Sequence, residues 1–320
     1  MAESLDVIDR MLAKDGIALH SRPMQAAIEL VRLCITKVDE GSGEKPPGKF
    51  PDYLTSKWFR IIFKNTEQWY RDRFADAMDA GRSRERDAVT LVRDTPYLVK
   101  VPTTTTEPSE PGQSFWLCYH DAVRSDEDVI AWVRHGPNFT ALTSKDVKSA
   151  RAVTEMVATK LRSIHVSLLE MEGKNTRLGE LREAIMPNLE RAARHLAAGA
   201  ADEFRLAHWD MQMACELALK CLAQQRAGTF RETHDLFLLY DTMPEAFPPF
   251  ARTELSTLPN WKKMADLRYG GGPAITTRQA FRAYRATLTI VDATLGALKR
   301  PYRIGKARFH LKRPPWMEGD

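Results

Sequence analysis

The spacing of apolar residues divides the chain into helical stretches and a short region of strands. Apolar residues recur every three or four positions over 22–40 and 52–81, which predicts two helices, the second rich in aromatics. Between 88 and 123 the pattern changes to short apolar runs separated by turn-forming residues. That change predicts a small antiparallel sheet of two to four strands, with a turn at Asp94-Thr95-Pro96. The proline- and threonine-rich segment 102–113 should form neither a helix nor a central strand.

Helical patterns return after the predicted sheet. We expect a short helix over 125–133, capped by Ser125, and a long helix over 143–172 that begins at Thr143. Further amphipathic stretches follow at 178–199, 201–228, 233–243 and 276–299. Pro187 should kink or interrupt the first of these four, and Gly228 should end the second. Helices that each bury one apolar face close most simply as a bundle.

These patterns predict the fold class and the division into domains. We expect an α+β N-terminal domain with a small antiparallel sheet over residues 1–175. An all-α bundle of four to five helices should follow over 176–300, and a basic C-terminal tail over 301–320. The chain has a net charge of +5, and seven basic residues with no acidic one lie between Lys299 and Arg313. The positive charge therefore belongs mostly to the C-terminal end.

Several classes of protein are disfavoured by the composition. No apolar run is long enough to cross a bilayer, and the acidic N-terminus lacks the apolar core of a signal peptide, so we expect a cytoplasmic protein without membrane partners. The four cysteines include no Cys-x-x-Cys pair, which indicates neither a zinc site nor a disulfide framework. No metal site and no cofactor are predicted.

The C-terminal part resembles a known family. The residues that carry the resemblance are Ala214, Glu216, Leu219, Lys220 and Leu222 on one predicted helix, then Gly228, then the Thr-His-Asp-Leu sequence from Thr233 to Leu236, and Leu239. This order resembles the HEPN domain, an α-helical bundle of prokaryotic and some eukaryotic proteins, over about residues 178–298. The first 175 residues resemble no family. The resemblance implies a homodimer that binds RNA, a nucleotide or a partner protein, such as one of the nucleotidyltransferase type, in bacterial defence or toxin–antitoxin systems.

Many proteins of the HEPN family are ribonucleases, in which an arginine and, a few residues later, a histidine stand near the start of the final helix. Such a pair combines proton transfer with a cationic clamp on phosphate. The final predicted helix here has arginines but no histidine. A formal match, Arg303 and His310, lies beyond that helix, and His234 and His208 are other candidates for moving a proton. We therefore favour a non-catalytic binding module; the alternative is a metal-independent ribonuclease with an atypical histidine.

The candidate binding residues are basic. Arg278, Arg282 and Arg285 are four and three residues apart, so they form one stripe on the final helix, away from its apolar seam. Such a stripe can contact phosphates without reading a base sequence, although a solvated surface is the alternative. The further candidates around this helix are Arg268, Tyr269, Lys299, Arg300 and Arg303.

Two local interpretations stay open. His234-Asp235 either belongs to a site or marks the start of a helix, with Thr233 as the cap and Asp235 in the first turn. Glu216 and Lys220, four residues apart, most simply form a pair within their helix, but their presence in the family pattern could equally mean a contact between subunits. A third interpretation of the whole chain is an interaction scaffold whose N-terminal domain, with its aromatic residues, recognises the partner.

Overall fold

The computed structural model describes residues 1–39, 41, 43–79, 85–110, 114–171, 176–243, 250–259, 263 and 274–312. Helices make up 61% of it and its sheets are small and antiparallel, so the mixed fold with a helical C-terminal region is as predicted. The chain forms two compact units. Unit 1 contains Met1–Arg84, Thr106–Leu117 and Phe309–Asp320, and unit 2 contains Glu85–Thr105 and Cys118–Arg308. This division differs from the predicted boundary near 175, because the hairpin after residue 85 and the helix before 170 pack on the C-terminal helices.

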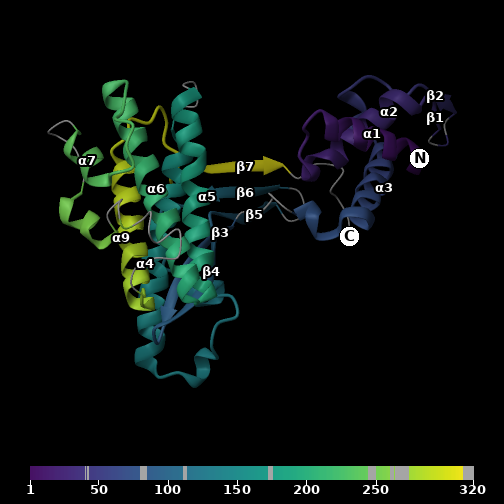
Figure 1. Cartoon of the computed structure of the whole chain (residues 1–320). Helices are drawn as coiled ribbons and strands as arrows, with labels where there is room; N and C mark the ends of the chain where they lie inside the picture. The colour runs from purple at the N-terminus through teal and green to yellow at the C-terminus, as the bar shows by residue number, and fades with distance from the viewer. Residues whose placement is uncertain are drawn as a thin grey trace. The chain divides into compact units, whose positions relative to one another are not determined.

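Unit 1 is built on three helices in its described part: α1 (Ala2–Lys14), α2 (Arg22–Cys34) and α3 (Lys57–Phe74) (Figure 1). The predicted helices at 22–40 and 52–81 are therefore present but shorter. Two-residue strands β1 (Val38–Asp39) and β2 (Glu44–Lys45) follow α2, and the 3-10 turn η2 (Asp52–Thr55) precedes α3. The buried apolar residues form two clusters, one around Leu5, Leu30 and Tyr70 and the other around Val31 and Phe59.

Unit 2 contains a bundle of long helices. These are α4 (Ser144–Leu169), α5 (Thr176–Ala198), α6 (Ala201–Ala227) and α9 (Thr277–Gly296), which run side by side in Figure 1. The helix α5 packs on α6, α6 on α9 and α9 on α4. A hairpin of β3 (Glu85–Val92) and β4 (Thr95–Pro102) packs on α4 and α5. The helices and the hairpin of unit 2 share one hydrophobic core. Its buried residues include Val89, Val99, Leu161, Leu189, Leu219 and Leu288.

Local sequence explains where several helices begin and end. The Thr143 hydroxyl accepts a hydrogen bond from the Asp146 backbone N–H, so this predicted cap of α4 is confirmed. Gly228 adopts the left-handed conformation (φ 74°) that ends α6, which is also as predicted. The helix α9 begins with a capping box between Thr276 and Gln279.

Other local predictions were wrong. The expected helix at 125–133 is only the 3-10 turn η4 (Val129–Trp132), and its cap is Asp128 rather than Ser125. Pro187 does not interrupt α5, which is continuous over Thr176–Ala198. The hairpin turn lies at Arg93-Asp94, both with positive φ, because Thr95 and Pro96 already belong to β4. This two-residue turn has the left-handed geometry that matches the twist of paired strands.

A further sheet has the strand order β5 (Thr104–Glu110), β6 (Ser114–Tyr119), β7 (Arg308–Lys312). The segment expected to form no central strand provides β5, which is at the edge of this sheet and so agrees with that expectation. The strand β7 comes from the region predicted as a basic tail. At least residues 308–312 of that region are therefore part of a sheet.

Candidate functional site

The three arginines of α9 have different surroundings. Arg278, in the first turn, forms a two-pronged ion pair with Asp94 of the hairpin turn, with Nε–Oδ1 at 2.9 Å and Nη2–Oδ2 at 2.6 Å. The hydrogen bond and the charge of Arg278 outweigh desolvation and lower the pKa of Asp94. Arg278 therefore joins the hairpin to α9, whereas Arg282 and Arg285 of the predicted stripe have no ion-pair partner among the described residues.

Arg282 and Arg285 line a hollow of about 580 Å³ on unit 2. Both side chains are exposed, and neither guanidinium forms an ion pair or hydrogen bond within the part of the chain that the structure describes. The other lining residues come from α4, from α9 and from the 3-10 turn η6 (Arg252–Thr257): Met156, Lys160, Thr253, Glu254, Ser256, Thr257, Ala286 and Thr289. This hollow is the candidate functional site.

The core of unit 2 positions these side chains. Phe281, Tyr284 and Leu288 of α9 are buried, so the residues between them, Arg282 and Arg285, point outward. On α4 the buried Val157 and Leu161 leave Lys160 on the outer face in the same way. The turn η6 packs on α9 through its fully buried Leu255. The three elements therefore present a polar hollow over an apolar core.

The charges that line the hollow favour an anion. Three cationic side chains, Arg282, Arg285 and Lys160, stand beside one carboxylate, that of Glu254. Lys160 is also 3.5 Å from Asp292, which offsets part of its charge. A guanidinium presents several donors in a plane and matches phosphate or carboxylate oxygens, and a hollow of this volume falls within the usual range of ligand pockets.

The basic residues after α9 are less available than predicted. The Arg300 guanidinium is 2.8 Å from the buried carboxylate of Glu170 and 3.0 Å from the Ser167 hydroxyl, and its side chain is only 10% exposed. Glu170 also accepts hydrogen bonds from the backbone N–H groups of Ile304 and Gly305. Arg300 is therefore an internal ion-pair partner, so its guanidinium is less available to a ligand than the sequence predicted.

Two other predicted binding residues stay exposed. Lys299 is exposed, and its backbone N–H donates to Gln225. Arg303 is 67% exposed, with Nη1 at 3.9 Å from Glu170. Arg268 and Tyr269 lie outside the described residues.

His234 is held by a buried carboxylate. Its Nδ1 is 3.0 and 3.1 Å from the two carboxylate oxygens of Glu216, a residue of α6 that is 2% exposed. Lys220 pairs with the same carboxylate at 2.9 Å, which confirms the predicted pair within the helix. Gln212 donates to the carbonyl of His234. These contacts fix the segment before the short helix α7 (Leu236–Asp241) against α6.

The cap of α7 is Asp235, not Thr233 as predicted. The Asp235 carboxylate accepts hydrogen bonds from the backbone N–H groups of Phe237 and Leu238, whereas the Thr233 hydroxyl accepts one from Asp235 itself. A carboxylate closer to the helix therefore satisfies the free N–H groups of its first turn.

The remaining histidine candidates, His310 and His208, have partners of their own. His310, on β7, contacts the Ser114 hydroxyl at 3.0 Å and the Trp116 ring at 4.7 Å between centroids. Arg303 belongs to unit 2 and His310 to unit 1. His208 is buried and its Nδ1 contacts the Phe204 carbonyl oxygen at 2.7 Å; burial lowers its pKa and so disfavours a protonated ring.

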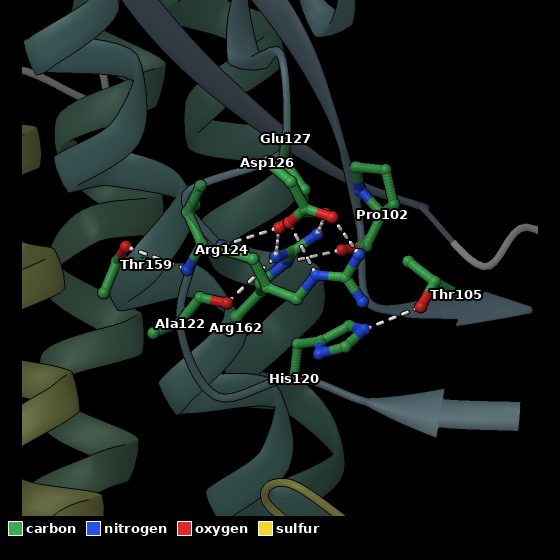
Figure 2. A network of polar contacts seen from close by, with 10 residues as sticks. Pro102, Thr105, His120, Ala122, Arg124, Asp126, Glu127, Thr159 and Arg162 are labelled. Carbon is green, nitrogen blue, oxygen red and sulfur yellow. Dashed lines mark hydrogen bonds and ion pairs between the residues drawn. The ribbon is translucent and has the colours of Figure 1, made fainter. Parts of the chain in front are cut away.

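A network around Arg162 was not predicted (Figure 2). Arg162 lies on the buried stripe of α4 and donates to both carboxylate oxygens of Glu127 and to the backbone carbonyls of Pro102 and Ala122. Its guanidinium also lies 5.0 Å from the centre of the Trp132 ring. These contacts occupy the guanidinium, so the network holds the segment before η4 rather than a ligand. A charged residue directly after Leu161 in an apolar stripe was the available signal.

No metal site is found among the residues that the structure describes, and the two thiols of α6 are buried. No group of three or more His, Cys, Asp or Glu in the described ranges could hold a metal ion, and no described helix is long and apolar enough to cross a membrane. All four cysteines are free. Burial raises the pKa of Cys215 and Cys221 to about 12, so both thiols stay protonated at neutral pH.

Comparison with known proteins gives no assignment. No family model, no curated protein and no solved structure matches the chain. The function must therefore be argued from the site itself.

Proposed function

We propose that unit 2 is a non-catalytic module that binds a phosphate-bearing ligand, RNA or a nucleotide, in the hollow between α4, α9 and η6. The observation that carries the proposal is that Arg282 and Arg285 have no partner among the described residues, yet both line the same polar hollow as Lys160. A phosphate would supply acceptors for both guanidinium groups at once.

Arg278 can be compared with the two arginines that line the hollow. It is exposed on the same helix as Arg282 and Arg285, but it has a partner in Asp94. Among the described residues, one arginine of the stripe thus has an ion-pair partner, and the two that line the hollow have none. The hydroxyl groups of Thr253, Ser256 and Thr257 add further polar groups around a bound phosphate.

The departure of residues 178–298 from the pattern of the HEPN ribonucleases supports binding rather than cleavage. The final helix of this chain carries arginines but no histidine over Thr277–Gly296, and the general acid–base partner of that family is thus missing. We carry over from the resemblance to that family, as proposals, a homodimer, a nucleotidyltransferase-type partner protein and a place in bacterial defence or toxin–antitoxin systems.

Binding of a labelled single-stranded RNA and of ATP, each followed by fluorescence or calorimetry, tests the proposal. We expect the double variant Arg282→Ala/Arg285→Ala to bind at least about tenfold more weakly, which corresponds to about 1.4 kcal/mol. The matched control is Arg278→Ala, which removes an arginine from the same helix but outside the hollow, and it should bind as the parent does. Equal affinity of the double variant and the parent for both ligands would refute the proposal, and the ligand that responds identifies the class.

A second candidate function is metal-independent cleavage of RNA. The observation that favours it is the contact between Glu216 and His234, since a carboxylate that orients an imidazole is the arrangement of a general base. RNA cleavage in the presence of EDTA that disappears in His234→Ala would support this alternative. RNA that stays bound and intact in parent and variant would leave the binding module as the function.

A further inference from the structure

We propose that unit 1 contains a separate binding site for a small aromatic carboxylate, in the hollow between α2 and residues 47–53. The hollow has a volume of about 720 Å³ and is lined mainly by apolar surface. This inference concerns a different unit from the phosphate site and does not depend on it.

One wall of the hollow is a face of α2. The residues Gln25, Ile28, Glu29 and Arg32 line it, and Ile35, directly after the helix, extends it. Their spacing of three, one, three and three residues places them on one side of the helix. The opposite side of α2 packs in the core, where Leu30 is buried in one apolar cluster and Ala27 in the other. The face that lines the hollow therefore points away from these core residues.

The opposite wall is the segment before α3. Pro47, Gly48, Lys49 and Phe50 line it, together with Tyr53 of η2. Tyr53 is buried in the second apolar cluster, which fixes this wall on α3. Phe50 is 59% exposed, although its ring meets the Tyr53 ring edge-on at 6.2 Å between centroids.

The apolar lining explains why an aromatic ligand suits the hollow. Ile28 and Ile35 are only partly buried and Phe50 is exposed, so the concave surface presents apolar groups to water. Covering such surface removes apolar area from water, which favours binding. A ligand ring can also continue the edge-on contact of Phe50 and Tyr53, an arrangement that aromatic pairs favour.

The charges at the rim explain why the ligand should carry a carboxylate. Arg32 donates to Glu29 through both Nε and Nη2, so these two charges neutralise each other. The Lys49 ammonium has no hydrogen bond or ion pair within the described ranges of the chain. Lys49 therefore leaves one net positive charge at the rim, which an anionic group would complement. A neutral ligand would bury the same apolar surface but leave this charge without a partner.

Titration of the full chain with 2-naphthoate, followed by calorimetry, tests the inference, with uncharged 2-naphthamide as the matched probe. We expect saturable binding of naphthoate and binding of the amide at least about tenfold weaker. Lys49→Glu should weaken naphthoate binding by at least the same factor. Lys57→Glu, which reverses the charge of an exposed lysine outside the hollow, should leave it unchanged.

Two further variants establish where naphthoate binds. Phe50→Ala should weaken naphthoate binding while circular dichroism stays that of the parent, because Phe50 is exposed. Arg282→Ala/Arg285→Ala should not change it, since those residues belong to the other hollow. The inference is overturned if naphthoate does not bind at millimolar concentration, if Lys49→Glu binds as the parent does, or if the double arginine variant abolishes binding.

Discussion

Arg162 and Glu127 form a two-pronged ion pair, with Nη1–Oε2 at 2.6 Å and Nη2–Oε1 at 2.7 Å. The Arg162 side chain has no exposed surface, and that of Glu127 is 11% exposed. Figure 2 shows the pair between α4 and the end of β4, where it fastens the segment that leads to η4. A charge buried this completely depends on its partner.

Removal of this carboxylate should destabilise unit 2. We expect Glu127→Gln to lower the free energy of unfolding by about 3 kcal/mol, because Arg162 would keep a buried charge without its counter-ion. The melting temperature should fall by about 6–12 °C, measured by circular dichroism. The control is Asp126→Asn, which removes a neighbouring but exposed pair with Arg124 and should leave the melting temperature nearly unchanged. Similar melting temperatures for the two variants would contradict the expectation.

His165 should make stability depend on pH. Burial, and then the charge of Arg86, lowers its pKa to about 4, whereas an unfolded chain has a value of about 6.5. Between these values the unfolded state binds the extra proton, so stability should fall by about 3 kcal/mol as the pH drops from 6.5 to 4. His165→Leu should remove this part of the pH dependence, measured by urea unfolding at several pH values. An unchanged pH dependence in this variant would contradict the prediction; the exposed His310→Gln serves as control.

The cap of α7 can be tested locally. We expect Asp235→Ala to cost about 1 kcal/mol, because two backbone N–H groups of the first turn lose their acceptor. Hydrogen exchange of the α7 amides should become about fivefold faster. Thr233→Ala keeps the cap and should have a smaller effect. If Thr233→Ala accelerated exchange more than Asp235→Ala, Thr233 would be the effective cap after all.

Glu170 should protect the segment after α9 from proteolysis. It accepts hydrogen bonds from Arg300 and from the backbone of Ile304 and Gly305. In Glu170→Ala these contacts are lost, so we expect faster tryptic cleavage at Arg303 and Lys306, followed by mass spectrometry. Glu180→Ala, at an exposed position of α5, is the control. Equal cleavage rates would show that other contacts hold the segment.

The salt dependence of RNA binding should show whether the arginines of the hollow contact phosphates. Each phosphate contact with a single strand contributes about 0.7 to the slope of log affinity against log salt. We expect Arg282→Ala/Arg285→Ala to reduce the slope by about 1.4. Arg300→Ala should leave the slope unchanged because Arg300 is paired with Glu170. A slope that falls with Arg300→Ala instead would place the RNA at the C-terminal segment.

The sequence predicted well those elements whose apolar residues repeat regularly. The stripe through Val157, Leu161 and Ile164 is buried as expected, and the seam through Phe281 and Leu288 correctly placed Arg282 and Arg285 on the outside. Burial of a repeating face is a local pattern, so it can be read from neighbouring positions.

Contacts between distant parts of the chain could not be read in this way. Arg278 and Asp94 are 184 residues apart, and Arg300 and Glu170 are 130 apart. Each pair gives a predicted binding residue a partner within the chain. The turn η6, which completes the hollow, has no regular spacing of apolar residues. The sequence therefore did not predict it.

Unit 1 consists of three separate stretches of the chain, and this affects how it can fold during translation. Its helices α1, α2 and α3 leave the ribosome early, but Phe309–Lys312 of β7 belong to the same unit and are translated after all of unit 2. The three-stranded sheet must therefore wait for its last strand, with the edge of β6 unpaired in the meantime. The nascent protein consequently needs to keep that edge from pairing with other chains until translation has passed residue 312.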